Sequence, residues 1–257
     1  MFNPQVNKIF LPLFILGFIL ITKIATAAIS DVETAILKEN YQEAKKLAQE
    51  LIGTNSDKNV SNHAKYYLAL SQLRLKEYKD ARDVFKQLIQ SPVDVQMRDK
   101  AYLGLFDSYY LDEQYADALE AMQRLLIVSP KSEFLSLTYL KLARVNMKLA
   151  HWKEAHEYLD KIINRFPMSM EFYIAKQLLE EKEYFAVQLG SFTDRDLAEK
   201  LVDELKRKNE YAYVVETTDQ QNKKFYRVRA GQLASIDQAQ KLKSRLAGLG
   251  YPTQIYP

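Results

Sequence analysis

The hydrophobic and polar positions in the first two thirds of the chain repeat with a fixed period. Aromatic residues recur every 37 positions, at Tyr41, Tyr78, Tyr115 and Trp152. Three positions after each comes an alanine: Ala44, Ala81, Ala118 and Ala155. Seven positions further comes an aliphatic pair: Leu51-Ile52, Leu88-Ile89, Leu125-Leu126 and Ile162-Ile163. Such a period predicts stacked helical hairpins. The aromatic residue begins each second helix, the alanine allows close helix approach, and the aliphatic pair packs on the next unit.

Apolar residues at helical spacing predict the first helix of each hairpin, over residues 64–75, 101–111 and 135–149. Turn residues separate the units at Ser91-Pro92, Ser129-Pro130 and Phe166-Pro167. Residues 168–183 predict a final amphipathic helix that caps the array. Residues 31–183 are therefore expected to form an all-α domain, in which the first unit has only a short first helix.

The period changes after residue 184. Residues 185–192 alternate apolar with small or polar side chains, which predicts a strand. A helix is predicted over 195–208 with Asp194 as its N-cap, and a second helix from Ser235 or Asp237. Three further strands are predicted over residues 211–217, 225–233 and 253–256. The order βαββαβ predicts a four-stranded antiparallel sheet with both helices on one face.

The other face of this sheet is the candidate binding surface. Period two places Phe225, Arg227 and Arg229 in one row of the third strand, and arginines are not expected beneath helices. An aromatic ring can stack on a sugar, and a guanidinium group can bond carboxylate or hydroxyl groups. The row therefore predicts a binding platform, and the alternative is a solvated face without a ligand.

The N-terminal segment has the pattern of an export signal. Lys8 precedes an apolar run over residues 9–21, and Ala25-Thr26-Ala27 forms a cleavage pattern. The run gives about 20 Å of helix, short of the roughly 30 Å core of a bilayer. We expect residues 1–27 to be a cleaved signal peptide. An uncleaved inner-membrane anchor is the alternative, because Lys23 is unusual before a cleavage site. Either way, the rest of the chain is expected in the periplasm or cell envelope.

Composition narrows the chemistry further. The chain has no cysteine, which excludes thiolate catalysis, disulfides and cysteine-bound metal. Its three histidines, His63, His151 and His156, are interpreted as surface residues. The sequence shows no Ser/His/Asp set, metal-ligand cluster or Gly-rich phosphate loop, so we expect no enzyme activity, cofactor or metal.

Charge is small overall and unevenly distributed. The net charge of +3 predicts no large nucleic-acid footprint. Residues 31–183 carry 22 basic and 24 acidic side chains, whereas residues 184–257 carry 12 basic and 9 acidic ones. The C-terminal part is therefore the better partner for an anionic ligand.

The helical units resemble the tetratricopeptide repeat. Its pattern Y/W-x-x-A-x-x-x-F/L-x-x-L, with a closing proline in the last two units, fits at Tyr78-Ala81-Phe85-Leu88, Tyr115-Ala118-Met122-Leu125-Pro130 and Trp152-Ala155-Leu159-Ile162-Pro167. The period exceeds the usual value of about 34, which predicts a longer turn between units or a longer first helix. The resemblance implies a groove for a protein partner. Five tyrosines either line this groove or pack between helices: Tyr66, Tyr67, Tyr109, Tyr110 and Tyr139.

The C-terminal part resembles the sporulation-related repeat, or SPOR domain. The matching motifs are Phe185-Ala186-Val187-Gln188-Leu189-Gly190-Ser191-Phe192, then Ala198 and Leu201, then Tyr226-Arg227-Val228-Arg229-Ala230-Gly231. Gln232-Leu233 departs from the Pro-Phe common in the family, and we expect this to affect only the turn. The resemblance implies binding to peptidoglycan, with a preference for glycan strands stripped of stem peptides, and gathering at division sites.

The same resemblance implies the binding residues. By position these are Gln188, Ser191, Phe225, Arg227 and Ile255. Arg229 is added because period two places it beside Arg227. We expect Gln188 and Arg227 to be exposed. Three positions along a regular strand lead to the opposite face, so Ser191 joins Gln188 only if Gly190 permits a β-bulge.

Together these patterns predict a multidomain protein, with an all-α tetratricopeptide-type solenoid at 31–183 and a small α+β domain of ferredoxin or RNP-like type at 184–257. We expect a non-catalytic envelope protein that binds peptidoglycan glycan strands through the SPOR domain and an unidentified protein through its repeats, in cell division or wall remodelling. One alternative is an envelope assembly or scaffold factor acting mainly through the repeats. Another is an RNA-recognition-like nucleic-acid binder, against which the export signal argues. Membrane contact is expected only through an uncleaved N-terminal segment.

Overall fold

The computed structural model describes residues 29–54, 57–180, 183–219 and 221–256. The predicted signal peptide or anchor at residues 1–27 lies outside these ranges. Contacts divide the chain into two compact units, and the boundary between them falls between Ser132 and Glu133. In the described ranges, no helix has the length and apolar character needed to cross a membrane.

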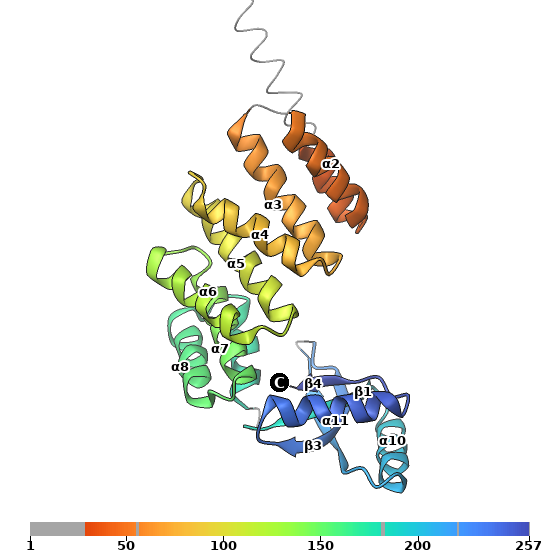
Figure 1. Ribbon diagram of the computed structural model, residues 1–257. Coiled ribbons are helices and arrows are strands. Elements are labelled where there is room, and N and C mark those ends of the chain that lie inside the picture. Colours follow the sequence, from red (N-terminus) through yellow and green to blue (C-terminus); the bar gives the residue numbers. More distant parts are fainter. Residues whose placement is uncertain (1–28, 55–56, 181–182, 220, 257) are drawn as a thin grey trace, which may run out of the picture. The chain divides into compact units, whose positions relative to one another are not determined.

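The first unit is a series of antiparallel helices (Figure 1). After helical residues 29–37 come α2 (Tyr41–Thr54), α3 (Lys58–Arg74), α4 (Tyr78–Gln90), α5 (Val95–Leu111) and α6 (Tyr115–Val128). From α2 onward, each helix packs against the next one in the sequence. The periodic aromatic residues begin α2, α4 and α6, as the pattern predicts.

The first helices of the hairpins start earlier than the apolar pattern predicts. Helices α3 and α5 have 17 residues each, and their extra turns precede the predicted starts at 64 and 101. Asp57 caps α3 by accepting the amide of Asn59 at 2.8 Å, and Asp94 caps α5 by accepting the amide of Met97 at 2.7 Å. In these two units the long period thus comes from a longer first helix, whereas the helix Leu135–Lys148 of the last unit has 14 residues and follows a longer connection over residues 129–134.

The turn inside each hairpin uses a left-handed residue that is not glycine. Glu39, Lys76, Glu113 and Ala150 have φ between 57° and 63°, and each stands two positions before a periodic aromatic residue. The Lys76 amide bonds the Leu73 carbonyl oxygen at 3.2 Å, and the next amide reaches one residue further back at 2.8 Å. This is the Schellman pattern, in which glycine is usual because a side chain is strained at positive φ.

Two contacts in the core of the first unit are especially close. The ring of Phe85 covers Gly104, and a Cβ at residue 104 would lie 2.3 Å from Phe85 Cζ. The carboxylate of Asp99 is 1% exposed and accepts hydrogen bonds from Ser129 Oγ at 2.6 Å and Ser132 Oγ at 2.5 Å. It therefore ties α5 to the turn that follows α6.

The second unit begins with α7 (Leu135–Lys148), α8 (Trp152–Arg165) and α9 (Glu171–Leu179). Helix α9 packs on α7 and α8, and it is shorter at both ends than the predicted capping helix over 168–183. The ring of Trp152, which begins α8, lies 5.4 Å from the buried ring of Phe185, between centroids.

The rest of the second unit has the predicted βαββαβ order: β1 (Phe185–Phe192), α10 (Arg195–Arg207), β2 (Ala212–Thr218), β3 (Lys224–Leu233), α11 (Ile236–Gly248) and β4 (Gln254–Tyr256). Asp194 caps α10 and Ser235 caps α11. The four strands pair antiparallel in the order β2-β3-β1-β4. The core lies between this sheet and the two helices. The opposite side of the sheet is the open face.

Candidate functional site

One row of polar and aromatic side chains crosses all four strands on the open face. Tyr213 of β2 stands opposite Arg229 of β3, Arg229 stands opposite Gln188 of β1, and Gln188 stands opposite Gln254 of β4. Directly opposed residues of an antiparallel pair point to the same face. These four residues form the central row of the open face.

A β-bulge in β1 brings a second pair of residues to this face. The register shifts between Gln188 and Gly190, and beyond the shift Ser191 stands opposite Arg227. Ser191 is exposed and Arg227 is half-buried. A Cβ at residue 190 would lie 2.6 Å from a ring atom of Phe192, so the bulge closes tightly around a glycine.

Arg229 lies in the central row but is closed to solvent. Its guanidinium carbon is 3.4 Å from the centroid of the Tyr256 ring, and only 2% of the residue is exposed. Gln188 and Arg227 are half-buried. The expectation that these two residues are exposed needs correction, and the open face presents one partly accessible guanidinium group rather than two. These side chains are less exposed than expected because they pack closely against side chains of the neighbouring strands. The residue pattern within a single strand does not reveal that packing.

Three polar atoms of the open face lack a hydrogen-bond partner within the described part of the chain: Gln188 Oε1, Arg227 Nε and Thr217 Oγ1. All three are shielded from solvent by their neighbours. A buried polar atom left unsatisfied costs about 1–3 kcal/mol, so a side-chain movement that brings one of these atoms into contact with a polar ligand would gain a hydrogen bond. The amide oxygen accepts, the guanidinium Nε donates, and the hydroxyl can do either.

Phe225 and Ile255, the two remaining predicted site residues, lie on opposite faces of the sheet. Phe225 stands opposite Thr217 on the open face, with Lys223 Nζ 5.4 Å from its ring centroid. Ile255 stands opposite Val187, which belongs to the core on the helix side. The structure therefore brings five of the six predicted residues to the open face and places Ile255 on the other one.

Sequence reasoning missed four polar residues of the open face: Tyr213, Thr217, Gln254 and Tyr256. The Tyr213 hydroxyl donates to the Gly231 carbonyl oxygen at 3.1 Å and lies 3.1 Å from the Tyr184 hydroxyl. Burial, and next the hydrogen bond with Tyr184, raise the pKa of Tyr213, so it remains a neutral donor. Period two within β2 identifies the row of Tyr213, but only the register identifies its neighbours.

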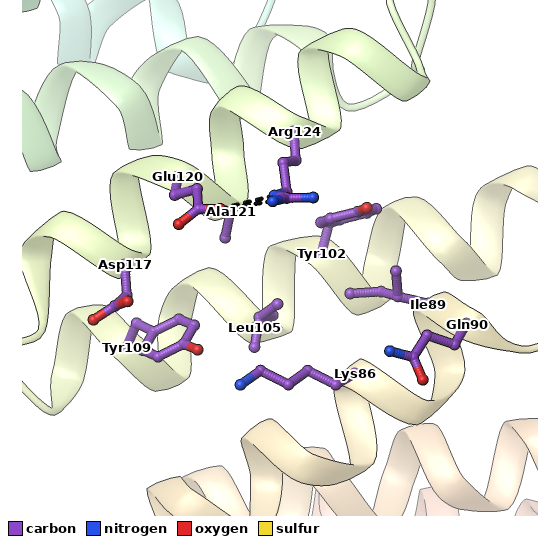
Figure 2. Close-up of a pocket in the computed structure, with 10 residues that line it drawn as sticks. All are labelled: Lys86, Ile89, Gln90, Tyr102, Leu105, Tyr109, Asp117, Glu120, Ala121 and Arg124. Atoms are coloured by element: carbon purple, nitrogen blue, oxygen red, sulfur yellow. Dashed lines mark hydrogen bonds and ion pairs between the residues drawn. The ribbon is translucent and has the colours of Figure 1, made fainter.

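A second candidate site is a groove of about 320 Å³ in the first unit (Figure 2). It lies between α4 and α6, the second helices of two successive hairpins. Its base is formed by Tyr102, Leu105 and Tyr109 of α5, and its walls include Lys86 of α4 and Arg124 of α6. A second hollow, of about 370 Å³, shares Tyr102 and Arg124 with this groove and continues it toward the end of α6.

The groove combines an aromatic base with charged walls. Lys86 Nζ lies 5.4 Å from the centroid of the Tyr109 ring, close enough for a cation–π interaction. On the other wall Arg124 forms an ion pair of 2.9 Å with Glu120. Ile127, in the adjoining hollow, is 78% exposed. These features suit an amphipathic peptide segment of a protein partner.

The structure shows which of the five tyrosines considered above line a groove and which pack between helices. Tyr109 lines the groove of Figure 2. Tyr66 and Tyr67 pack edge to face at 5.7 Å between centroids, and Tyr110 stacks at 5.3 Å on a ring of its own helix. Tyr139 is buried beside another ring at 5.9 Å. Packing is therefore the role observed for all but Tyr109.

The histidines and acidic residues give no sign of a metal site in the ranges that the structure covers, where no three His, Asp or Glu side chains are placed to hold an ion. His63 and His151 are exposed, and His156 lies 3.8 Å from the carboxylate of Glu183.

Comparison with protein families agrees with the helical repeats and with the βαββαβ domain. Residues 181–256 match the SPOR domain, and residues 37–94 and 138–169 match tetratricopeptide repeats. SPOR domains bind peptidoglycan, and tetratricopeptide repeats bind proteins. No curated protein sequence matches the chain.

Among solved structures, similarity extends over most of the chain at low sequence identity. Two structures of nearly identical TPR-like repeats of a proposed kinesin light chain from Podosopora anserina, one of them a point variant, each have a TM-score of 0.50 and 14% identity. Each alignment covers 71% of this chain, and 92% of the variant chain or 93% of the other. At this identity the likeness describes the repeat fold alone.

Proposed function

We propose that this chain, which carries tetratricopeptide repeats and a C-terminal SPOR domain, is a non-catalytic protein of the cell envelope that docks on glycan strands stripped of stem peptides and holds a protein partner on its repeats. The observation that carries the proposal is the open face, where Gln188, Ser191, Phe225 and Arg227 share one side of the sheet. Cell division or wall remodelling is the process in which such docking would act.

The chemistry of a bare glycan strand fits this face. Its N-acetyl groups and hydroxyls both donate and accept hydrogen bonds, as Gln188 Oε1 and Arg227 Nε require. Its muramic acid residues carry carboxylates, which a guanidinium group binds well. Stem peptides convert these carboxylates to amides, so they would remove the charged partner of Arg227 and add bulk above the sheet.

The groove in the first unit supports the second part of the proposal. Its aromatic base and charged walls can hold a peptide segment while the sheet holds the glycan, because the two surfaces share no residue. The groove also supports the alternative of an envelope assembly or scaffold factor, in which the repeats would carry the main activity.

Co-sedimentation tests glycan binding. The full chain should sediment with sacculi from which an amidase has removed the stem peptides, and much less with untreated sacculi. An excess of single-stranded oligonucleotide should not release it. Equal sedimentation with both kinds of sacculi would contradict the proposed preference, and release by the oligonucleotide would favour nucleic-acid binding.

Capture and localisation test the remaining parts. Tyr109→Ala should lower the capture of the repeat partner from an envelope extract, whereas Tyr173→Ala, at an exposed tyrosine of α9, should not. A fluorescent fusion should locate to the envelope and gather at the division septum, and N-terminal sequencing should find the chain cleaved after Ala27. A cytoplasmic fusion would contradict the proposed location.

A further inference from the structure

One of the two arginines of the open face is enclosed by its neighbours. Arg229 stands in the central row, directly between Tyr213 and Gln188. It is 2% exposed, and the ring of Tyr256 lies over its guanidinium carbon at 3.4 Å from the ring centroid. A planar guanidinium group binds a carboxylate through its edge and stacks through its face, but both modes need access. A ligand on this surface therefore meets Tyr256 before it meets Arg229.

The element that carries Tyr256 is the least firmly held part of the sheet. Strand β4 has three residues, stands at an edge, and pairs with β1 alone. Of its residues, only Ile255 stands opposite a residue of the core on the helix side. Local opening of a short edge strand disrupts few hydrogen bonds and little buried surface, so its free energy is at the low end for a folded domain.

We infer that Tyr256 is a gate on the ligand site and that Arg229 is a ligand-binding residue behind it. In the closed state the phenol ring occupies the face of the guanidinium group. In the open state the ring moves aside, and Arg229 binds a carboxylate of the glycan next to Gln188. The inference rests on the proposed function, because it takes the open face to be the glycan site.

A gate of this kind sets the affinity of the site. When only a fraction of the molecules is open, the apparent affinity falls in proportion to that fraction. The free energy of a stacked, desolvated cation–π contact corresponds to a change of about 5- to 30-fold in the apparent affinity for the ligand. Selectivity follows from the same arrangement, because a ligand with a well-placed carboxylate compensates for the lost contact and a neutral sugar chain does not.

The binding test compares three variants of the full chain with the wild type on amidase-treated sacculi. Tyr256→Ala should bind about 5- to 30-fold more tightly. Tyr256→Phe keeps the ring and should bind like the wild type. In the Tyr256→Ala background, Arg229→Met should cancel the gain. If Tyr256→Ala binds no better than the wild type, Tyr256 is not a gate, and weaker binding would make its ring part of the platform.

A chemical test needs no glycan. Phenylglyoxal modifies accessible guanidinium groups, and mass spectrometry identifies the modified residue. Arg229 should react slowly in the wild type and several-fold faster in Tyr256→Ala, while the exposed Arg207 reacts equally in both. Unchanged protection of Arg229 would overturn the gate. If Arg229 becomes reactive but no folded variant binds sacculi, the proposed function fails, and Arg229 loses its assignment as a glycan-binding residue.

Discussion

Ser191 stands directly opposite Arg227 in the ladder between β1 and β3. The bulge before Ser191 produces this pairing, because it gives β1 one more residue than β3 between two aligned positions. A second polar pair therefore lies beside the central row of the open face. Arg227 is also the more accessible of the two arginines on this face, so it is the first residue to test.

Arg227→Ala should weaken binding to amidase-treated sacculi by about tenfold or more, since a hydrogen bond to a charged group contributes about 1.5–3 kcal/mol. The free energy of unfolding should change little, because Arg227 has no ion-pair partner among the described residues. Arg207→Ala removes the same charge from the exposed end of α10 and is the matched control. Equal losses in both variants would show that net charge alone governs binding.

Gly104→Ala should destabilise the repeats by about 1–3 kcal/mol, because the new Cβ would overlap the ring of Phe85 and force a core aromatic side chain to move. Gly53→Ala in α2 is the control, because among the described residues no atom beyond its chain neighbours and the backbone of its own helix lies within 4 Å of the added Cβ. That variant should be neutral or stabilising by up to about 1 kcal/mol. Urea unfolding followed by circular dichroism measures both. A Gly104→Ala variant as stable as the wild type would contradict the close contact.

Lys76→Gly should stabilise the repeats by about 0.5–1 kcal/mol, because residue 76 has φ 63° and glycine adopts this conformation without strain. The gain is limited by the greater freedom of glycine in the unfolded chain. Lys76→Ala separates backbone from side chain, since alanine keeps the strain and removes only the ammonium group. If both variants shift the unfolding midpoint equally, the effect comes from the lost charge.

Asp99→Ala should destabilise the first unit by about 1–3 kcal/mol, because it leaves the hydroxyls of Ser129 and Ser132 without their buried acceptor. Asp83→Ala on the exposed side of α4 should change stability by less than about 0.5 kcal/mol. Hydrogen exchange should show a loss of amide protection at the turn after α6. Protection that is lost evenly along the unit would argue against a local tie at Asp99.

The sequence predicted the features that depend on local spacing. Helices α4, α6 and α8 begin at the periodic aromatic residues because those rings must fill the same place in each hairpin. It did not predict the early starts of α3 and α5, because their first turns are largely polar and the signal lies in the caps, Asp57 and Asp94. The left-handed turn at Lys76 was also not predicted, because no glycine or asparagine marks it.

At the sheet, the row of Phe225, Arg227 and Arg229 followed from period two alone. The closure of Arg229 did not, because it requires Tyr256, which is 27 positions away and belongs to a strand that does not pair with β3. The face on which Ile255 lies was unpredictable for a similar reason. Its face depends on its register with Val187, and the spacing of residues within a three-residue strand does not determine that register.

The bulge at Gly190 has a consequence for comparing related chains. Leu189 and Gly190 together oppose Val228, so one of the two is an insertion in the strand. A relative that lacks this residue would have a regular strand in which serine follows glutamine after one intervening position, and both side chains would still reach the same side of the sheet. An alignment should therefore place its gap at Gly190. A gap elsewhere in β1 would exchange surface positions for core positions and assign the binding role to the wrong side chains.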